Sequence, residues 1–276
     1  MTYVRNGWGL VRSQFPSVII LFLYQLLWGL FFYRLIHSAV IALLSRYPDP
    51  PPNELSQVLY LIEGQIELGR SPAIHQYLWM LFGLIALRLL MTPLFQAGIL
   101  YGMKPPEEQG AGLPLFRGMK EFWKPVTLFF LLELILLALP GLWIIPKLAA
   151  LWPWLIPGGG RLGPLLAIIG LLLGWAAYGW LIRQLLLFSQ FGYLFKTGVW
   201  NSLLISLRHL LPGIAISLIL GTAGAVLFLI CGAFSWIWTG LAAMVLQQTY
   251  PFIRSLFQIW SISSQYELWQ TKLHKG

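Results

Sequence analysis

Charged residues are scarce in this sequence. Only 10% of the 276 residues are Asp, Glu, Lys or Arg, whereas 58% are hydrophobic. A soluble domain carries roughly a quarter charged residues, so this chain has too little charge to cover a surface that faces water. The composition therefore predicts a membrane protein, with residues 1–276 as a single polytopic domain.

Cysteine is rarer still, because Cys231 is the only one in the chain. A single cysteine excludes an internal disulfide and a multi-cysteine metal site. The four histidines lack the spacing of motifs such as HExxH. The sequence also lacks a GxSxG motif, a Walker loop and paired carboxylates suited to acid–base catalysis. We therefore predict no catalytic residue, no metal site and no cofactor, in a protein that is not an enzyme.

The sequence instead contains long runs of apolar residues. A membrane helix needs about 20 apolar residues, and six stretches meet that length. They are residues 17–40, 77–101, 125–145, 164–195, 210–231 and 235–262. The predicted fold class is an all-α membrane protein of about six transmembrane helices, arranged as three helical hairpins.

The basic residues predict how these hairpins are oriented. Lys and Arg concentrate in connections that stay cytoplasmic, and ten of them lie on the side that holds both termini, against four on the other side. The ten are Arg5, Arg12, Lys104, Arg117, Lys120, Lys124, Lys196, Arg208, Lys272 and Lys275, and the four are Arg46, Arg70, Lys147 and Arg161. We expect cytoplasmic termini. Because the net charge of +9 is scattered over span ends and forms no stripe with stacking aromatics, nucleic acid is not an expected partner.

An internal repeat is visible in the connections as well as in the spans. The stretches "WGLVRSQFPSVIILFL", "FRGMKEFWKPVTLFFL" and "LLISLRHLLPGIAISL" each place a short amphipathic segment before a proline, at Pro16, Pro125 and Pro212. Proline is tolerated in the first turn of a helix. Each stretch therefore predicts an interfacial elbow helix that leads into an odd-numbered span.

The even-numbered spans share a second pattern near their cytoplasmic ends: "RLLMTPLFQAGILYG", "RQLLLFSQFGYLFKTG" and "QQTYPFIRSLFQIW". Aligning their prolines and glutamines puts Gln96, Gln190 and Arg254 at one equivalent depth. The repeat units are then about residues 4–103, 110–198 and 199–267.

This threefold pattern of elbow, span, loop and span resembles the integral-membrane domain associated with some bacterial glycerophosphoryl diester phosphodiesterases. It is also similar to stand-alone, six-span bacterial membrane proteins of the same pattern. The resemblance covers most of the chain but rests on architectural motifs, and the phosphodiesterase barrel is absent. It implies a fold and a place in the bacterial cell membrane, with lipid-related or envelope-related work.

Charged residues inside the predicted spans suggest a site. Ionisable groups in a span face the protein interior, water or the interface. Guanidinium binds phosphate in bidentate fashion. One hypothesis is an inward-facing cavity for an anionic lipid headgroup or a small phosphorylated solute. Its lining would be Arg88, Arg183, Arg254, Gln96, Gln190 and Gln247, with Glu133 as a buried ion-pair partner for one of the arginines. In the alternative, Arg183 and Arg254 reach the cytoplasmic headgroups along their aliphatic stems, and Arg88 forms a structural pair with Glu133.

Three classes of function are compatible with these features. The first is a non-enzymatic protein that organises lipids or binds an anionic headgroup, with its lead-in helices as docking surfaces for a protein partner. The second is a transporter or flippase subunit for an anionic lipid or phosphorylated solute. Its buried arginines and proline-bearing spans favour it, although the repeats run parallel and not inverted. A lipid-modifying enzyme ranks last, because no nucleophile or base is identifiable.

Overall fold

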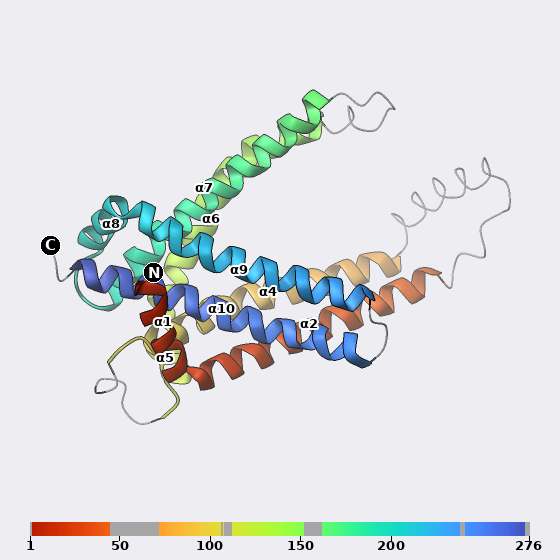
Figure 1. The fold of residues 1–276 in the computed structure, drawn as a ribbon. Coiled ribbons are helices and arrows are strands. Elements are labelled where there is room, and N and C mark those ends of the chain that lie inside the picture. Colours follow the sequence, from red (N-terminus) through yellow and green to blue (C-terminus); the bar gives the residue numbers. More distant parts are fainter. Residues whose placement is uncertain are drawn as a thin grey trace. The chain divides into compact units, whose positions relative to one another are not determined.

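The computed structural model describes residues 2–44, 72–105, 107, 112–151, 162–237 and 241–273 (Figure 1). These residues are almost entirely helical, and no β-strand occurs among them, which confirms the all-α prediction. The helices are α1 (Thr2–Ser13), α2 (Phe15–Leu44), α4 (Pro72–Tyr101), α5 (Pro114–Glu121), α6 (Trp123–Leu151), α7 (Leu162–Leu194), α8 (Val199–Arg208), α9 (Leu210–Ile237) and α10 (Leu241–Leu273).

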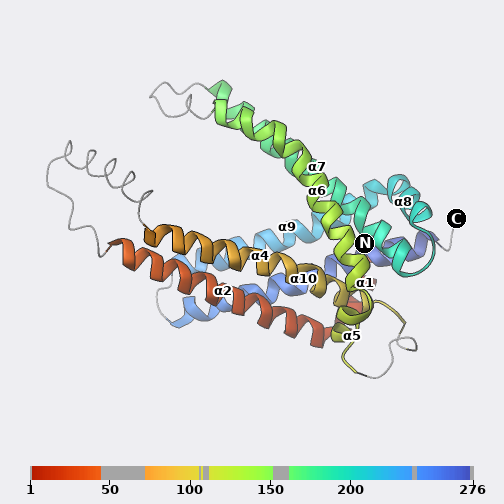
Figure 2. The same cartoon turned by 180° about the vertical axis from the view of Figure 1, so that it is seen from behind.

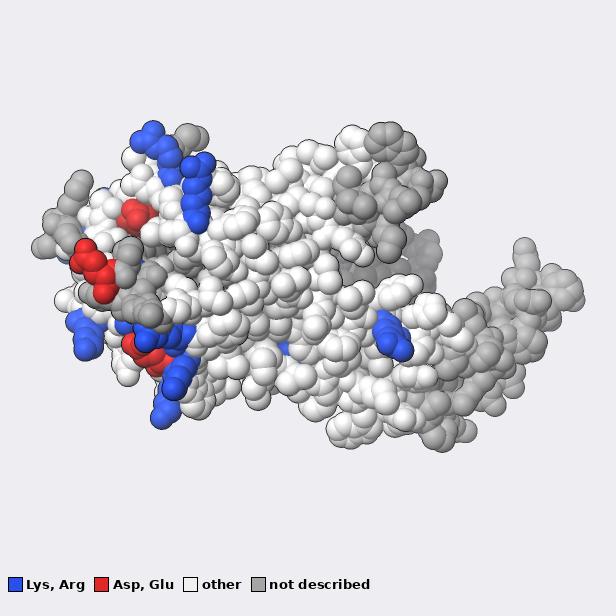
Figure 3. All heavy atoms as spheres, turned by 90° about the horizontal axis from the view of Figure 1, so that it is seen from below, with Lys and Arg blue, Asp and Glu red and all other residues white. Residues whose placement is uncertain are grey.

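Five of these helices, α2, α4, α6, α7 and α9, are long and apolar enough to cross a membrane. They coincide with the first five predicted spans. Their large apolar side chains lie mostly on the outside, as at Leu166 and Leu173 of α7, which are 64% and 65% exposed. Figure 3 shows broad areas without any Lys, Arg, Asp or Glu. Exposed apolar surface of this extent suits contact with lipid.

The sixth predicted span differs from the helix that the structure places there. The sequence predicts residues 235–262, whereas α10 comprises Leu241–Leu273. Among the described residues, α10 does not reach the apolar character of the other five. Polar residues are frequent in the second half of α10, as at Arg254, Ser255, Gln258, Ser263 and Gln265, and they lower its mean hydropathy.

The contacts divide the chain into two compact units: Met1–Val18 with Pro93–Gly276, and Ile19–Thr92. In the second unit, α2 and α4 run side by side, and the Tyr77 hydroxyl donates a hydrogen bond of 3.4 Å to the Ser38 carbonyl oxygen. In the first unit, α6 pairs with α7 and α9 pairs with α10 (Figure 2).

A short amphipathic helix precedes each odd-numbered long helix: α1 before α2, α5 before α6, and α8 before α9. One residue separates the two helices of each pair, at Gln14, Phe122 and His209. The amide of this residue donates to the carbonyl oxygen four residues earlier in all three pairs, at 3.1, 2.9 and 3.0 Å. Pro16, Pro125 and Pro212 fall in the first turn of the helix that follows, where proline removes no intrahelical hydrogen bond.

Each short helix crosses the end of an even-numbered long helix at a close backbone approach. A methyl group added to Gly98 of α4 would lie 2.7 Å from the Leu115 carbonyl oxygen of α5, and one added to Gly192 of α7 would lie 2.6 Å from Ser202 Cβ of α8. One added to Gly7 of α1 would lie 2.8 Å from Ser264 Cα of α10.

These three crossings fall at matching positions of the short helices. Leu115, Ser202 and Gly7 each lie seven residues before the residue that separates their short helix from the next long helix, which is Phe122, His209 or Gln14. Helices α5 and α8 pack on the long helix just before them in the chain, whereas α1 packs on the last described helix, α10. Helix α1 therefore lies against α10 as α5 and α8 lie against α4 and α7.

Candidate functional site

The polar residues of α10 form a stripe on one face of the helix. Arg254, Gln258, Ser261 and Gln265 are spaced by four, three and four residues, which is the spacing of neighbours along one helical face. All four line a cavity of about 460 Å³ between α10, α9 and α7. Gln265 is buried and Gln258 and Ser261 are half-buried, whereas Arg254 is exposed. The stripe therefore runs from an exposed arginine at one end to a buried glutamine at the other.

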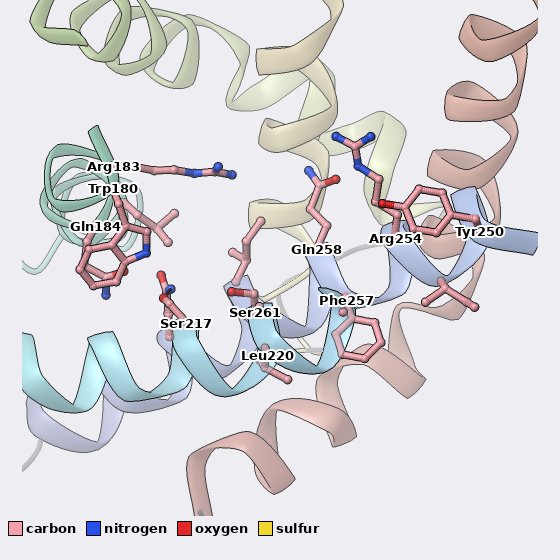
Figure 4. Close-up of a pocket in the computed structure, with 16 residues that line it drawn as sticks. Trp180, Arg183, Gln184, Ser217, Leu220, Tyr250, Arg254, Phe257, Gln258 and Ser261 are labelled. Carbon is pink, nitrogen blue, oxygen red and sulfur yellow. Dashed lines mark hydrogen bonds between the residues drawn. The ribbon is translucent and has the colours of Figure 1, made fainter. Parts of the chain in front are cut away.

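Helix α7 supplies the second wall of the cavity. Trp180, Arg183, Gln184 and Leu187 lie on one face of α7 and line it. Figure 4 shows the Arg183 guanidinium extending from α7 toward α10, where the Gln258 and Arg254 side chains point to the same side. The Gln184 side chain is only 4% exposed.

Helix α9 supplies the third wall, with small residues that let the other side chains approach. Ser217, Gly221 and Gly224 line the cavity. The Gln265 amide nitrogen donates a hydrogen bond of 2.9 Å to Ser217 Oγ, which ties α10 to α9. One turn before Ser217, a methyl group at Gly213 would lie 2.6 Å from Gln184 Nε2, so the glycine leaves room for that amide.

The cavity carries an excess of positive charge. Arg183 and Arg254 both line it, and both are exposed residues. None of its described lining residues is a carboxylate, and within the described residues neither guanidinium forms an ion pair. Glu133 of α6 is close enough to act electrostatically on Arg183 but forms no direct ion pair with it. Two guanidinium groups without a paired carboxylate at one cavity favour an anionic ligand.

The structure brings together only part of the predicted site. Arg183 and Arg254 share the cavity, but Gln96 and Gln190 bind each other instead, with 3.0 Å from the Gln96 amide nitrogen to the Gln190 side-chain oxygen. Arg88 belongs to the other unit, where its guanidinium lies 5.7 Å from the centre of the Phe32 ring. The Gln247 side chain lies outside the described residues.

The alignment that placed Arg254 beside Gln96 and Gln190 also needs correction. It pairs Leu256 with Gly98 and Gly192. In the structure, however, the residue of α10 at the helix crossing, which corresponds to Gly98 of α4 and Gly192 of α7, is Ser264. The third repeat is thus shifted by eight residues, from 256 to 264. Arg254 lies ten residues before the crossing, whereas Gln96 and Gln190 lie two residues before it. Apolar sequence aligns easily with itself, and matching Pro93 to Pro251 selected the wrong register.

The sequence prediction did not include five polar residues of the cavity, which are Gln184, Ser217, Gln258, Ser261 and Gln265. A signal for three of them was present, because Gln258, Ser261 and Gln265 continue the helical spacing that begins at Arg254. Gln184 and Ser217 stand alone in apolar helices, and only the packing of α7 against α9 and α10 reveals them.

No family model, curated protein or solved structure matches this chain. The resemblance to the membrane domain of the phosphodiesterases therefore rests on the sequence pattern alone.

Proposed function

We propose that this chain is a polytopic protein of the bacterial cell membrane, with six spans in three hairpins and cytoplasmic termini. Five long apolar helices and three short amphipathic helices support this arrangement. In this proposal α10 is the sixth span, and α7 and α9 cover its polar stripe most fully at the buried Gln265. The repeat pattern links the chain to the phosphodiesterase-associated membrane domain, and the short helices offer cytoplasmic surfaces to a protein partner.

The activity that we propose is non-enzymatic binding of an anionic lipid headgroup or a small phosphorylated solute. The observation that carries it is the pair Arg183 and Arg254 in one cavity, with no ion pair to either guanidinium in the described part of the chain. Guanidinium groups bind phosphate oxygens through parallel, charge-assisted hydrogen bonds. In a cavity with low local dielectric, such bonds are stronger than in water.

The size and the other side chains of the cavity fit this ligand class. About 460 Å³ lies in the range of small-molecule sites, roughly 300–1,000 Å³. Gln258, Ser261 and Gln184 add polar groups that can bind the remaining oxygens of a phosphorylated group. The described lining contains no His, Cys, Asp or Glu, so it offers no obvious general base and suits binding better than catalysis.

Native mass spectrometry of the gently solubilised protein tests this proposal. The wild type should carry a defined phosphate-containing adduct, and the double variant Arg183→Gln with Arg254→Gln should lose it while keeping its fold. Arg208→Gln is the matched control, because it removes an exposed guanidinium at the end of α8. The same undefined lipid mixture on all three proteins would show that the arginines only anchor the helices.

A specific observation favours a second candidate, a transporter or flippase for the same class of anion. The stripe from Arg254 to Gln265 covers roughly 16 Å at 1.5 Å per residue, about half of a hydrocarbon core of ~30 Å. Polar groups along a membrane helix mark substrate pathways. Uptake of a labelled phosphorylated solute, or scrambling of a labelled anionic lipid, in proteoliposomes would support this candidate. Binding without either movement would favour the first.

A further inference from the structure

A second hollow surface lies beside the N-terminal helix. It is a groove of about 730 Å³, lined by Thr2, Val4, Arg5 and Trp8 of α1, Ile219 of α9, and Leu256 and Trp260 of α10. Apart from Thr2 and Arg5, these lining side chains are apolar or aromatic. The groove therefore has an apolar floor with a single cationic side chain.

The walls of this groove are held in place by specific contacts. The Trp260 indole nitrogen donates a hydrogen bond of 2.8 Å to the Val4 carbonyl oxygen, and the rings of Trp8 and Trp260 lie 5.0 Å apart. At the same interface Gly7 approaches the Ser264 backbone so closely that no side chain fits between them. Helix α1 is thus fixed on α10, and the groove between them is preformed.

The charge on α1 has one sign. Its sequence, TYVRNGWGLVRS, contains Arg5 and Arg12 and no Asp or Glu. Both arginines are exposed, and within the described residues neither forms an ion pair. The Arg12 guanidinium lies 5.9 Å from the centre of the Trp8 ring. Arg5, Trp8 and Arg12 are spaced by three and four residues, so they lie along the same side of α1. Arginine and tryptophan together on a short amphipathic helix are typical of the boundary between headgroups and acyl chains.

We propose that this groove binds a phospholipid with an anionic headgroup. The acyl chain lies against Ile219, Leu256 and Trp260, and the phosphate contacts Arg5. Charge complementarity selects the headgroup, because α1 offers two cations and no anion. The apolar floor selects an amphiphile over a free phosphate, which would leave that floor in water.

This site is distinct from the cavity of the proposed function. Ile219 and Leu256 line the groove, whereas their chain neighbours Leu220 and Phe257 line the cavity. The α9–α10 pair thus separates the two hollows, and no residue lines both. The groove can hold a lipid whether or not the cavity binds an anion.

Photolabelling tests the proposal on the full chain reconstituted in phosphatidylcholine bilayers. The probes are phosphatidylglycerol and phosphatidylcholine with a diazirine on the acyl chain, and the labelled peptides are identified by mass spectrometry. In the wild type, phosphatidylglycerol should label the α1 and Leu256–Trp260 peptides more strongly than phosphatidylcholine does. Arg5→Ala should reduce that phosphatidylglycerol labelling about fivefold, because one basic residue at an anionic headgroup contributes ~1 kcal/mol.

Four further variants make the result specific. Leu256→Trp and Ile219→Trp fill the groove and should abolish labelling by both lipids, while Arg208→Ala on α8 should change neither. The variant with Arg183→Gln and Arg254→Gln should keep the groove label, which separates this proposal from that of the cavity. Equal labelling by the two lipids, or unchanged labelling in Arg5→Ala, would overturn the proposal even if the tryptophan variants do not fold.

Discussion

The side-chain amide nitrogen of Gln96 donates a hydrogen bond of 3.0 Å to the side-chain oxygen of Gln190. These two residues precede the crossing glycines Gly98 and Gly192 by the same two positions, so equivalent sites of the first and second repeats bind each other. The pair joins α4 to α7 across more than 90 residues of chain. The bond uses one amide donor of Gln96 and the side-chain oxygen of Gln190, and it ties the two helices together.

Replacing one of these glutamines should therefore destabilise the protein more than replacing both. Gln190 is 1% exposed, so Gln96→Leu leaves a buried amide without its partner, at a cost of roughly 0.5–2 kcal/mol. The double variant with leucine at both positions removes the two polar groups together and should recover part of that loss. The free energy of unfolding in mixed micelles, measured for a double-mutant cycle, checks this. Strictly additive losses would contradict the pairing.

The three helix crossings predict a matched set of glycine variants. Gly7→Ala, Gly98→Ala and Gly192→Ala each place a methyl group against a neighbouring short or long helix, and overpacking of this kind costs typically 1–3 kcal/mol. Gly170→Ala in α7 is the control, because nothing lies within 4 Å of its added methyl group. The control should leave thermal stability in detergent unchanged or slightly raised, since alanine favours a helix. Similar stability for all four variants would argue against the close crossings.

The helical fold was predictable from the sequence because a lipid environment permits few backbone conformations. Backbone groups in a membrane must form their hydrogen bonds internally, so runs such as 77–101 and 164–195 predict long helices with little ambiguity. The short lead-in helices were predictable from their amphipathic pattern before Pro125 and Pro212. The ends of α10 were not predictable in this way, because its polar residues interrupt the run of apolar residues on which the prediction relied.

The cavity was only partly predictable, for a physical reason. Composition shows which polar groups are costly in lipid, but it does not show which ones meet. Arg183 and Arg254 line one cavity because α7 and α10 both pack near α9, whereas Gln96 donates a hydrogen bond to Gln190. The docking of α1 on α10 joins the two ends of the sequence, and no local pattern indicates such a contact.

That docking predicts a specific effect of Trp260→Phe. The substitution keeps an aromatic ring against Trp8 but removes the indole N–H that bonds the Val4 carbonyl oxygen, a loss of about 1 kcal/mol. Amide hydrogen exchange in α1 should accelerate about fivefold, while exchange in α6 stays unchanged. As a control, Trp200→Phe alters a residue of α8 that is 72% exposed, and it should leave amide hydrogen exchange in α1 unchanged. Equal protection of α1 in all three proteins would show that the bond does not hold this helix.

Glu133 acts electrostatically on Arg183, and this interaction predicts how a substitution at Glu133 changes the affinity for an anionic ligand. The prediction rests on the proposed anion site. The carboxylate partly offsets the positive potential of the cavity, since it acts on one of its two guanidinium groups. Glu133→Gln removes that negative charge with little change of shape, so an anionic ligand should bind about three- to tenfold more tightly, a gain of ~1 kcal/mol. Titration with a short-chain phosphatidylglycerol measures the Kd. Glu121→Gln, whose carboxylate pairs with Lys104 at 3.1 Å, is the control and should leave the Kd unchanged. Weaker binding in Glu133→Gln would mean that this carboxylate positions Arg183 for the ligand and does not compete with it.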